Sequence, residues 1–177
     1  MSRSVEDCLR TRRSVRRFTG EAVERGTVEA LLELAVLAPS ASNLQPWKFV
    51  IADDPALVQK IKSFSPGISG QPPCVITFCL DAALLPQRED GAPDTECAVL
   101  DLAMAAENLM LAAADRGLGT CVIKSFHPAL VRRILRLPDR LLPEFLVILG
   151  HPAQTPDMPK RRPVGELIRY NLEEGAF

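Results

Sequence analysis

A run of basic residues near the start of the chain carries side chains suited to binding an anion. The segment Arg12–Arg17 reads Arg-Arg-Ser-Val-Arg-Arg. Guanidinium groups hydrogen-bond phosphate oxygens in pairs, and a serine hydroxyl or a backbone N–H can complete such a site. If the segment is extended, Arg12, Ser14 and Arg16 share one face. The opposite face then carries Arg13, Val15 and Arg17. The segment therefore predicts a phosphate-binding face, although a solvated basic run explains the same residues.

A second basic cluster lies near the end of the chain, inside a segment rich in proline. It reads Lys160-Arg161-Arg162-Pro163. Taken alone, this cluster is typical of a solvated charged tail. A nucleic-acid site would call for a matching basic helix or interleaved aromatic side chains, and neither accompanies the basic segments. The formal net charge of -1 gives the whole chain no electrostatic attraction to nucleic acid or to an anionic membrane.

The polar loop from Pro39 to Trp47 precedes the first expected strand. It reads Pro-Ser-Ala-Ser-Asn-Leu-Gln-Pro-Trp. Short hydroxyl and amide side chains between two prolines offer hydrogen-bond donors and acceptors at a fixed geometry. Ser40, Ser42 and Asn43 are therefore candidate ligands of a polar ring system or a polyol chain, a role that a purely structural loop would not require.

The segment Gly117–Cys121 reads Gly-Leu-Gly-Thr-Cys and is not a dinucleotide-binding fingerprint. That fingerprint requires G-x-G-x-x-G after a strand, whereas these glycines precede one, and the chain also has no P-loop. The glycines instead predict the end of a helix followed by a strand. This strand ends at Lys124 and Ser125, which are candidate site residues because strand ends commonly carry binding groups.

Hydrophobic periodicity and capping signals predict the elements that position these residues. Helices are expected from Ser4 into the basic run, from an N-cap at Thr27 to Pro39, from Asp54-Pro55, over Thr95–Arg116, and from His127-Pro128 to Pro138. Strands are expected at Trp47–Ile51, Cys74–Leu80, Thr120–Ile123 and Phe145–Leu149, with a short final element at Val164–Tyr170. Helices followed by strands mixed with helices indicate one α+β domain.

Length and composition fit a single domain without disulfide support. The 177 residues are 47% hydrophobic, which suffices for one core. The five cysteines form no C-x-x-C pair, so we expect reduced, mostly buried thiols in a cytoplasmic protein and no zinc site. The N-terminus lacks the apolar core of a signal peptide, and polar residues interrupt the apolar stretch Ala98–Ala114, so we expect neither a leader nor a membrane span.

Five motifs occur in order along nearly the whole chain. They are R-R-S-x-R at Arg12–Arg16, P-S-x-x-N-x-Q-P-W at Pro39–Trp47, G-L-G-T-C at Gly117–Cys121, L-G-x-P at Leu149–Pro152 and K-x-R-P at Lys160–Pro163. In this combination the chain resembles the FMN-dependent nitroreductase family. The resemblance implies an α+β fold, a nitroreductase-like α/β/α sandwich with a central, mostly antiparallel sheet, in one domain over residues 1–177. It also implies an obligate homodimer with exchanged terminal segments and FMN in the interface.

The resemblance assigns cofactor-binding residues in several segments. The FMN phosphate would be held by Arg12, Ser14, Lys160 and Arg162, with Arg13 beside them, while Arg16 would approach the pyrimidine edge of the flavin. The partner subunit would contribute Ser40, Ser42 and Asn43, and the backbone groups near flavin N5 would be those of Lys124 and Ser125. Family members often carry glycine where Ser125 stands, an acidic residue or glycine at Lys124, and tyrosine in place of His151.

The activity that the resemblance implies is that of an FMN oxidoreductase. Hydride would pass from NADH or NADPH through flavin N5 to a small electron-poor acceptor, a nitro-compound or a quinone, in a ping-pong cycle. Arg16 would stabilise negative charge on the reduced flavin. No side chain would act as a catalytic nucleophile or a metal ligand. Two alternatives stay open: a biosynthetic or dehalogenating role in the same family, and a non-enzymatic binder that uses the basic run Arg10–Arg17.

Overall fold

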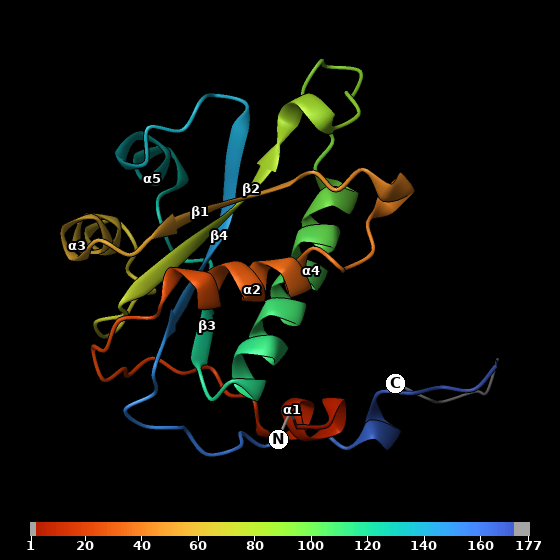
Figure 1. The fold of residues 1–177 in the computed structure, drawn as a ribbon. Coiled ribbons are helices and arrows are strands. Elements are labelled where there is room, and N and C mark those ends of the chain that lie inside the picture. Colours follow the sequence, from red (N-terminus) through yellow and green to blue (C-terminus); the bar gives the residue numbers. More distant parts are fainter. Residues whose placement is uncertain (1–2, 172–177) are drawn as a thin grey trace.

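The computed structural model describes residues 3–171 (Figure 1). In chain order, its helices and strands are α1 (Val5–Thr11), α2 (Arg25–Ala35), β1 (Trp47–Ala52), α3 (Pro55–Ser63), β2 (Cys74–Asp81), α4 (Glu96–Asp115), β3 (Gly119–Ile123), α5 (Pro128–Ile134) and β4 (Leu141–Gly150). Short 3-10 helices lie at Ala41–Asn43 (η1), Ala82–Leu84 (η2) and Val164–Glu166 (η3).

The centre of the described chain is a four-stranded sheet in the order β1-β2-β4-β3. Every neighbouring pair of strands is antiparallel. α2 and α4 pack on one face of the sheet, and α3 and α5 pack on the other (Figure 1). The predicted α+β fold, a sandwich of helices around a mostly antiparallel sheet, is therefore confirmed.

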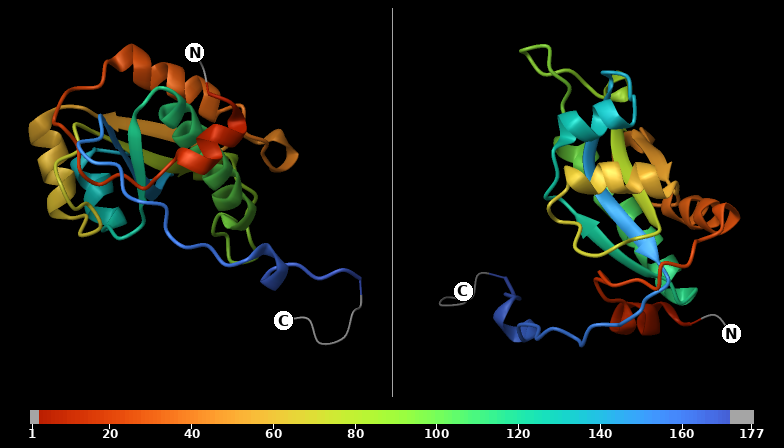
Figure 2. Two further views of the ribbon diagram at one scale, coloured as in Figure 1. Left: turned by 90° about the horizontal axis from the view of Figure 1, so that it is seen from below. Right: turned by 90° about the vertical axis from the view of Figure 1, so that its left-hand side faces the viewer.

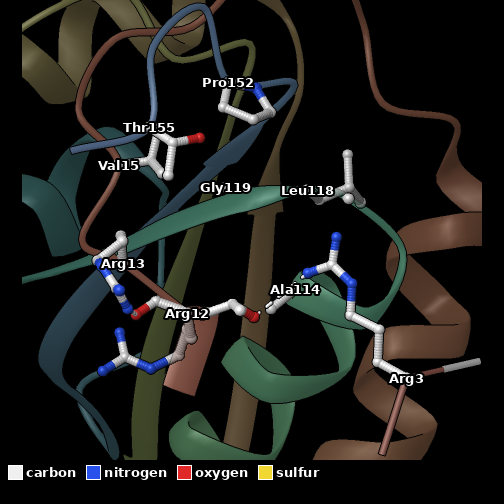
Figure 3. A pocket seen from close by; sticks show the side chains of 11 residues that line it. Arg3, Arg12, Arg13, Val15, Ala114, Leu118, Gly119, Pro152 and Thr155 are labelled. Atoms are coloured by element: carbon white, nitrogen blue, oxygen red, sulfur yellow. Dashed lines mark hydrogen bonds between the residues drawn. The ribbon is translucent and has the colours of Figure 1, made fainter. Parts of the chain in front are cut away.

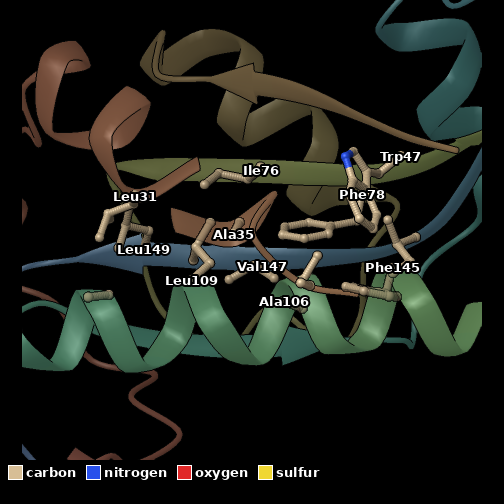
Figure 4. Close-up of a cluster of buried hydrophobic side chains, with 14 of the residues drawn as sticks. Leu31, Ala35, Trp47, Ile76, Phe78, Ala106, Leu109, Phe145, Val147 and Leu149 are labelled. Carbon is tan, nitrogen blue, oxygen red and sulfur yellow. The ribbon is translucent and has the colours of Figure 1, made fainter. Parts of the chain in front are cut away.

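The alternation of side chains along β2 divides the core into two clusters. All eight residues of this strand are buried because helices cover both faces of the sheet. Ile76 and Phe78 belong to the cluster under α2 and α4, whereas Val75 belongs to the cluster under α3 and α5. Phe78 stacks on Phe145 of β4 with ring centroids 5.0 Å apart, in the middle of the larger cluster (Figure 4).

α4 is the long central helix, and it ends as its glycine predicts. Gly117 has φ +73°, its N–H donates to the carbonyl of Ala114 (3.0 Å), and the N–H of Leu118 donates to that of Ala113 (2.8 Å). By length and composition α4 could cross a membrane, and half of its most apolar stretch is buried within the described chain. It packs against α1, α2 and the sheet as a core helix of a globular fold.

Several predicted boundaries need correction. α2 begins at Arg25 behind Glu24, so Thr27 is not its N-cap, and it ends at Ala35, before Pro39. The chain still buries Ala38 after the helix has ended, which is why the apolar spacing suggested a longer helix. The final element is shorter than expected, a 3-10 turn over Val164–Glu166.

β4 also begins four residues earlier than predicted, at Leu141 rather than Phe145. The early part contains Pro143, a residue that cannot donate to a ladder and that argues against a central strand. A shift in register between Phe78 and Cys79 of β2 accommodates the proline, because it breaks the regular ladder at that point.

Candidate functional site

The first basic segment is docked on β3, an edge strand of the sheet. Ser14 forms a parallel bridge with Thr120, and the N–H of Val15 donates to the carbonyl of Thr120 (2.9 Å). Val15 is 3% exposed and lies directly over Gly119. A Cβ on Gly119 would be 2.7 Å from that of Val15, so only glycine lets the segment approach the strand this closely.

The start of the C-terminal tail pairs with the same segment. Phe18 bridges Pro152, the N–H of Thr19 donates to the carbonyl of His151 (3.0 Å), and the N–H of Ala153 donates to that of Arg17 (2.9 Å). Segments more than 130 residues apart in sequence thus run side by side below the sheet (Figure 2). Backbone hydrogen bonds on both sides hold the basic segment in place.

Arg12 and Arg13 line a small cavity of about 100 Å³, together with Arg3, Val15 and Gly119 (Figure 3). The Arg12 guanidinium pairs with the carboxylate of Glu107 on α4 (Nε–Oε1 3.3 Å). One nitrogen of Arg13 donates to the carbonyls of Arg10 and Arg12, at 2.8 Å each, and so satisfies backbone groups at the end of α1.

A second cavity, of about 190 Å³, is lined by Ser14, Arg16 and Arg17 with Gln154 and Pro156. The predicted strict alternation is therefore wrong in part. Arg12 faces the first cavity with Arg13 and Val15, and Arg17 faces the second with Ser14 and Arg16. The physical reason is that the segment makes isolated bridges rather than a continuous ladder, so it has no uniform pleat.

The loop that carries Ser40, Ser42 and Asn43 has a tightly wound backbone. Ser42, Asn43 and Gln45 have φ of 51°, 55° and 49°, in the left-handed region that few side chains tolerate. The Ser40 hydroxyl accepts from the N–H of Gln45 (3.1 Å), and the amide oxygen of Asn43 accepts from the Gln45 side chain (3.0 Å). The carboxylate of Asp101, a buried residue of α4, accepts from the N–H of Ala41 (3.0 Å) and ties the loop to the core.

Lys124 and Ser125 follow β3, as predicted. The Lys124 ammonium donates to the carbonyl of Glu144 on β4 (2.6 Å) and lies 3.2 Å from its carboxylate. The carbonyl of Ser125 accepts from the N–H of Gly67 (3.0 Å). Lys124 and Glu144 also border a mostly apolar groove of about 440 Å³ between α5 and the start of β4.

Lys160 and Arg162 lie on the exposed part of the tail. Arg162 pairs with Glu166 (3.4 Å). Both cations are remote from β3, because this part of the tail extends away from the body (Figure 2). Among the described residues 3–171, no hydrogen bond or ion pair joins them to Arg12, Ser14 or Arg16. A single chain thus assembles the first basic cluster but does not bring the second one to it.

The sequence profile of the nitroreductase family matches residues 9–66 and 65–151, most of the chain. The chain belongs to the nitroreductase family. An FMN reductase (NADPH) from Bacillus subtilis is 29% identical, with 100% of this chain and 78% of the relative covered. An NADH dehydrogenase from Thermus thermophilus is 28% identical, over 90% and 92%. The crystal structure of a nitroreductase family protein from Clostridium difficile superposes with a TM-score of 0.81 at 25% identity, over 97% and 99% of the two chains.

Membership of the nitroreductase family confirms the predicted family and the prediction of an oxidoreductase. The buried thiols suit a structural role in such an enzyme. Burial raises the pKa of Cys74 and of Cys79 to about 12, so both stay protonated at neutral pH. Cys8 and Cys121 are buried as well and Cys97 is exposed, which agrees with the expectation of mostly buried thiols. Within residues 3–171 no group of His, Cys, Asp and Glu side chains could hold a metal ion.

Sequence reasoning missed four residues that shape this part of the nitroreductase fold. Glu107 and Asp101 contact the candidate segments from α4, and Gly67 and Gly70 approach Ser125 and Arg16 from the loop before β2. The two acids had a signal, since they interrupt an otherwise apolar helix. The glycines had none beyond a generic loop signal, because their contacts are with residues more than 50 positions away.

Proposed function

We propose that residues 1–177 form one FMN-binding domain of a cytoplasmic enzyme that uses NAD(P)H to reduce a small electron-poor acceptor. The observation that carries the proposal is the basic segment fixed between β3 and the start of the tail. It presents four arginines and a serine at two cavities, Arg12 and Arg13 at the first and Ser14, Arg16 and Arg17 at the second. Guanidinium and hydroxyl groups are the donors that a phosphate requires, so the residues present fit the phosphate of FMN.

Each candidate residue has a role in this proposal. Arg12, Arg13 and Ser14 bind the phosphate, and Arg16 neutralises charge at the pyrimidine edge of the flavin. The backbone groups of Lys124 and Ser125 contact the region of N5. The proposal is supported by the way these segments are held, since the backbone of Arg16 lies close against Gly70 and the carbonyl of Ser125 accepts from the N–H of Gly67 (3.0 Å).

Bound FMN would supply the redox chemistry, accepting hydride from NADH or NADPH and passing it to a nitro-compound or a quinone in a ping-pong cycle. The chain would bind and orient the cofactor and stabilise negative charge on its reduced form. No protein nucleophile is needed for this chemistry, so we assign no catalytic side chain. The relatives' names include both NADH and NADPH, so we propose either nucleotide as the electron donor.

A homodimer completes the proposed site. Ser40, Ser42 and Asn43 would reach the flavin of the partner subunit, and the tails would exchange so that Lys160 and Arg162 reach a phosphate. Large apolar side chains support this arrangement because they are exposed on α4, next to the polar loop and on the tail. They include Leu37 (73% exposed), Leu100 (62%), Val164 (67%) and Tyr170 (67%). Exposed apolar surface of this kind is typical of a face that a second chain covers.

The decisive experiment is a flavin titration of the purified chain, followed by anaerobic mixing with NADH or NADPH and then with a nitroaromatic compound or a quinone. We expect FMN to bind, to lose its visible absorbance with at least one donor, and to regain it on addition of acceptor. A chain that binds no FMN contradicts the proposal, and salt-dependent DNA binding by that flavin-free chain would favour the non-enzymatic binder. Bound FMN with negligible turnover of either acceptor would favour a specialised biosynthetic or dehalogenating role.

Light scattering tests the dimer independently of activity. We expect the mass of two chains for the FMN-bound protein. A stable monomer that retains FMN would contradict the shared site.

A further inference from the structure

The loop between α3 and β2 touches two separate parts of the candidate site. We name residues 65–70 the spacer loop. At one end, the N–H of Gly67 donates to the carbonyl of Ser125 (3.0 Å). A Cβ on Gly67 would lie 2.7 Å from Cγ2 of Ile123 and 3.2 Å from Cβ of Ser125. Ile123 is buried and cannot move aside freely, so the absence of a side chain at Gly67 determines how closely the loop approaches Ser125.

The other end of the spacer loop lies against the basic segment. Gly70 has φ +108°, a conformation that side chains other than glycine rarely adopt. A Cβ built on Gly70 would overlap the carbonyl oxygen of Arg16. The backbone of Arg16 therefore rests directly on the backbone of Gly70, and any larger residue would have to displace one of them.

The spacer loop is anchored to the core before Gly67 and again between Gly67 and Gly70. Ser65 is completely buried, and its hydroxyl donates to the carbonyl of Ile61 at the end of α3 (2.8 Å). Ile68 is 4% exposed and packs in the cluster under α3 and α5, and its N–H donates to the carbonyl of Ser65 (2.9 Å). The N–H of His127 also donates to the carbonyl of Phe64 (2.9 Å), just before the loop. Because of these contacts, the loop cannot shift as a whole to make room for a side chain at Gly67 or Gly70.

We propose that Gly67 and Gly70 are positioning residues that fix the separation between Ser125 and Arg16. This inference rests on the proposed function, in which Ser125 and Arg16 contact different parts of one rigid flavin ring. A rigid ligand is bound well only if both contacts are held at the correct spacing before it arrives. The spacer loop provides that spacing through backbone contacts, which only glycine permits.

The two glycines act on different contacts, so their substitutions have different consequences. Gly70→Ala displaces Arg16 and removes a cation from the pyrimidine edge. We expect FMN affinity to fall roughly tenfold, the loss of about one charged hydrogen bond, and the reduction potential of bound FMN to decrease because charge on the reduced form is less stabilised. Gly67→Ala displaces Ser125 by a few tenths of an ångström and lowers FMN affinity by a smaller factor.

The test measures the FMN dissociation constant and the reduction potential of bound FMN in each variant. The single variants are Gly67→Ala, Gly70→Ala and Arg16→Ala. Each glycine substitution is also combined with Arg16→Ala in a double variant. Because Gly70 acts through Arg16, the double variant with Gly70→Ala should bind FMN no more weakly than Arg16→Ala alone, with the same potential. Gly67→Ala acts elsewhere, and its effect should add to that of Arg16→Ala. Gly91→Ala is the matched control, since Gly91 also has positive φ (+78°) but no atom within 4 Å of its Cβ position.

Purely structural glycines would give a different result. Both variants would then lower the thermal midpoint of the flavin-free chain, while Gly70→Ala would leave the potential of bound FMN unchanged. The loss of FMN affinity in Gly70→Ala would also add to that of Arg16→Ala, and this result would overturn the proposal. If Gly70→Ala does not fold, as circular dichroism would show, Gly67→Ala decides the question, and an FMN affinity equal to that of Gly91→Ala contradicts the role. A wild-type chain that binds no FMN overturns the proposed function and this inference together.

Discussion

The two basic clusters of this chain differ in what holds them. The Arg12–Arg17 segment is fixed by backbone hydrogen bonds on both sides, to Thr120 of β3 and to Ala153 of the tail. Lys160 and Arg162 lie on an exposed, extended part of the tail, where Arg162 pairs with Glu166 (3.4 Å). Similar charge in the sequence thus has two structural forms, one built into the sheet edge and one carried on an extended segment.

Because the two clusters carry similar charge but are held differently, we expect them to contribute differently to the binding of an anion. The first cluster has already lost most of its backbone freedom in the folded chain, so little further entropy is lost when it binds an anion. The side chains of the second cluster are exposed, where water and salt screen their charges, so they contribute less net affinity for the same charges. We therefore expect the first cluster to control cofactor affinity and the second to modulate it.

The largest effect is expected at Arg12. Arg12→Ala should weaken FMN binding roughly 10- to 100-fold, because hydrogen bonds to charged groups contribute about 1.5–3 kcal/mol. Arg13→Ala should lose less, since its guanidinium already donates to the carbonyls of Arg10 and Arg12. Fluorescence titration with FMN measures both, and Arg25→Ala, which removes a cation paired with Asp53 elsewhere, is the control. Equal losses for Arg12 and Arg13 would contradict the comparison.

The anchoring of the first cluster can be broken at Gly119. Gly119→Ala places a Cβ 2.7 Å from that of Val15, and overpacking of this kind lowers the free energy of unfolding by about 1–3 kcal/mol. Denaturant unfolding measures the loss, and FMN affinity should fall with it. Gly26→Ala in α2, where the new Cβ meets nothing within 4 Å, should leave stability unchanged or raise it by up to about 1 kcal/mol. Unaltered stability of Gly119→Ala would show that close docking on β3 is not required.

The second cluster should affect binding without affecting stability. Lys160→Ala and Arg162→Ala should change the free energy of unfolding by less than about 0.5 kcal/mol, because both side chains are exposed. Each should weaken FMN binding by less than about tenfold, with a loss that shrinks at high salt. Arg161→Ala, on the same tail, is the matched control and should bind FMN as the wild type does. An equal loss for Arg161→Ala would mean that the tail acts only through its overall charge.

The smallest effect concerns the helix that leads into the first cluster. The hydroxyl of Ser4 donates a hydrogen bond to the carboxylate of Asp7, and so does the backbone N–H of Ser4. These two hydrogen bonds, the one from the hydroxyl more than the other, lower the pKa of Asp7 below the ordinary 3.8. A lowered pKa in the folded state stabilises the cap above pH 3.8, and this contribution is lost as the pH falls below that value. Amide protection in α1 should therefore decrease in acid. Asp7→Asn should remove this pH dependence, and an unchanged profile in that variant would contradict the assignment.

Local signals predicted those elements whose ends depend on their own residues. Asp54 caps α3 by accepting from the N–H of Leu57 (2.8 Å), and Gly117 ends α4, both as the sequence indicated. The prediction was wrong where distant residues decide, as at β4, where a register shift opposite β2 allows Pro143 to lie inside a strand. The N-cap at Thr27 was wrong as well, because α2 begins behind Glu24, which makes no side-chain cap.

By itself, the sequence determined which chemistry is available and in what order it occurs along the chain. The ordered motifs indicated the family, and the arginines and serine of residues 12–16 indicated an anion site. The tertiary structure decided which groups meet: Glu107 with Arg12, Gly119 with Val15, and the spacer loop with both Arg16 and Ser125. The physical reason is that hydrogen-bonding capacity belongs to each residue type, whereas distance depends on the packing of segments far apart in sequence.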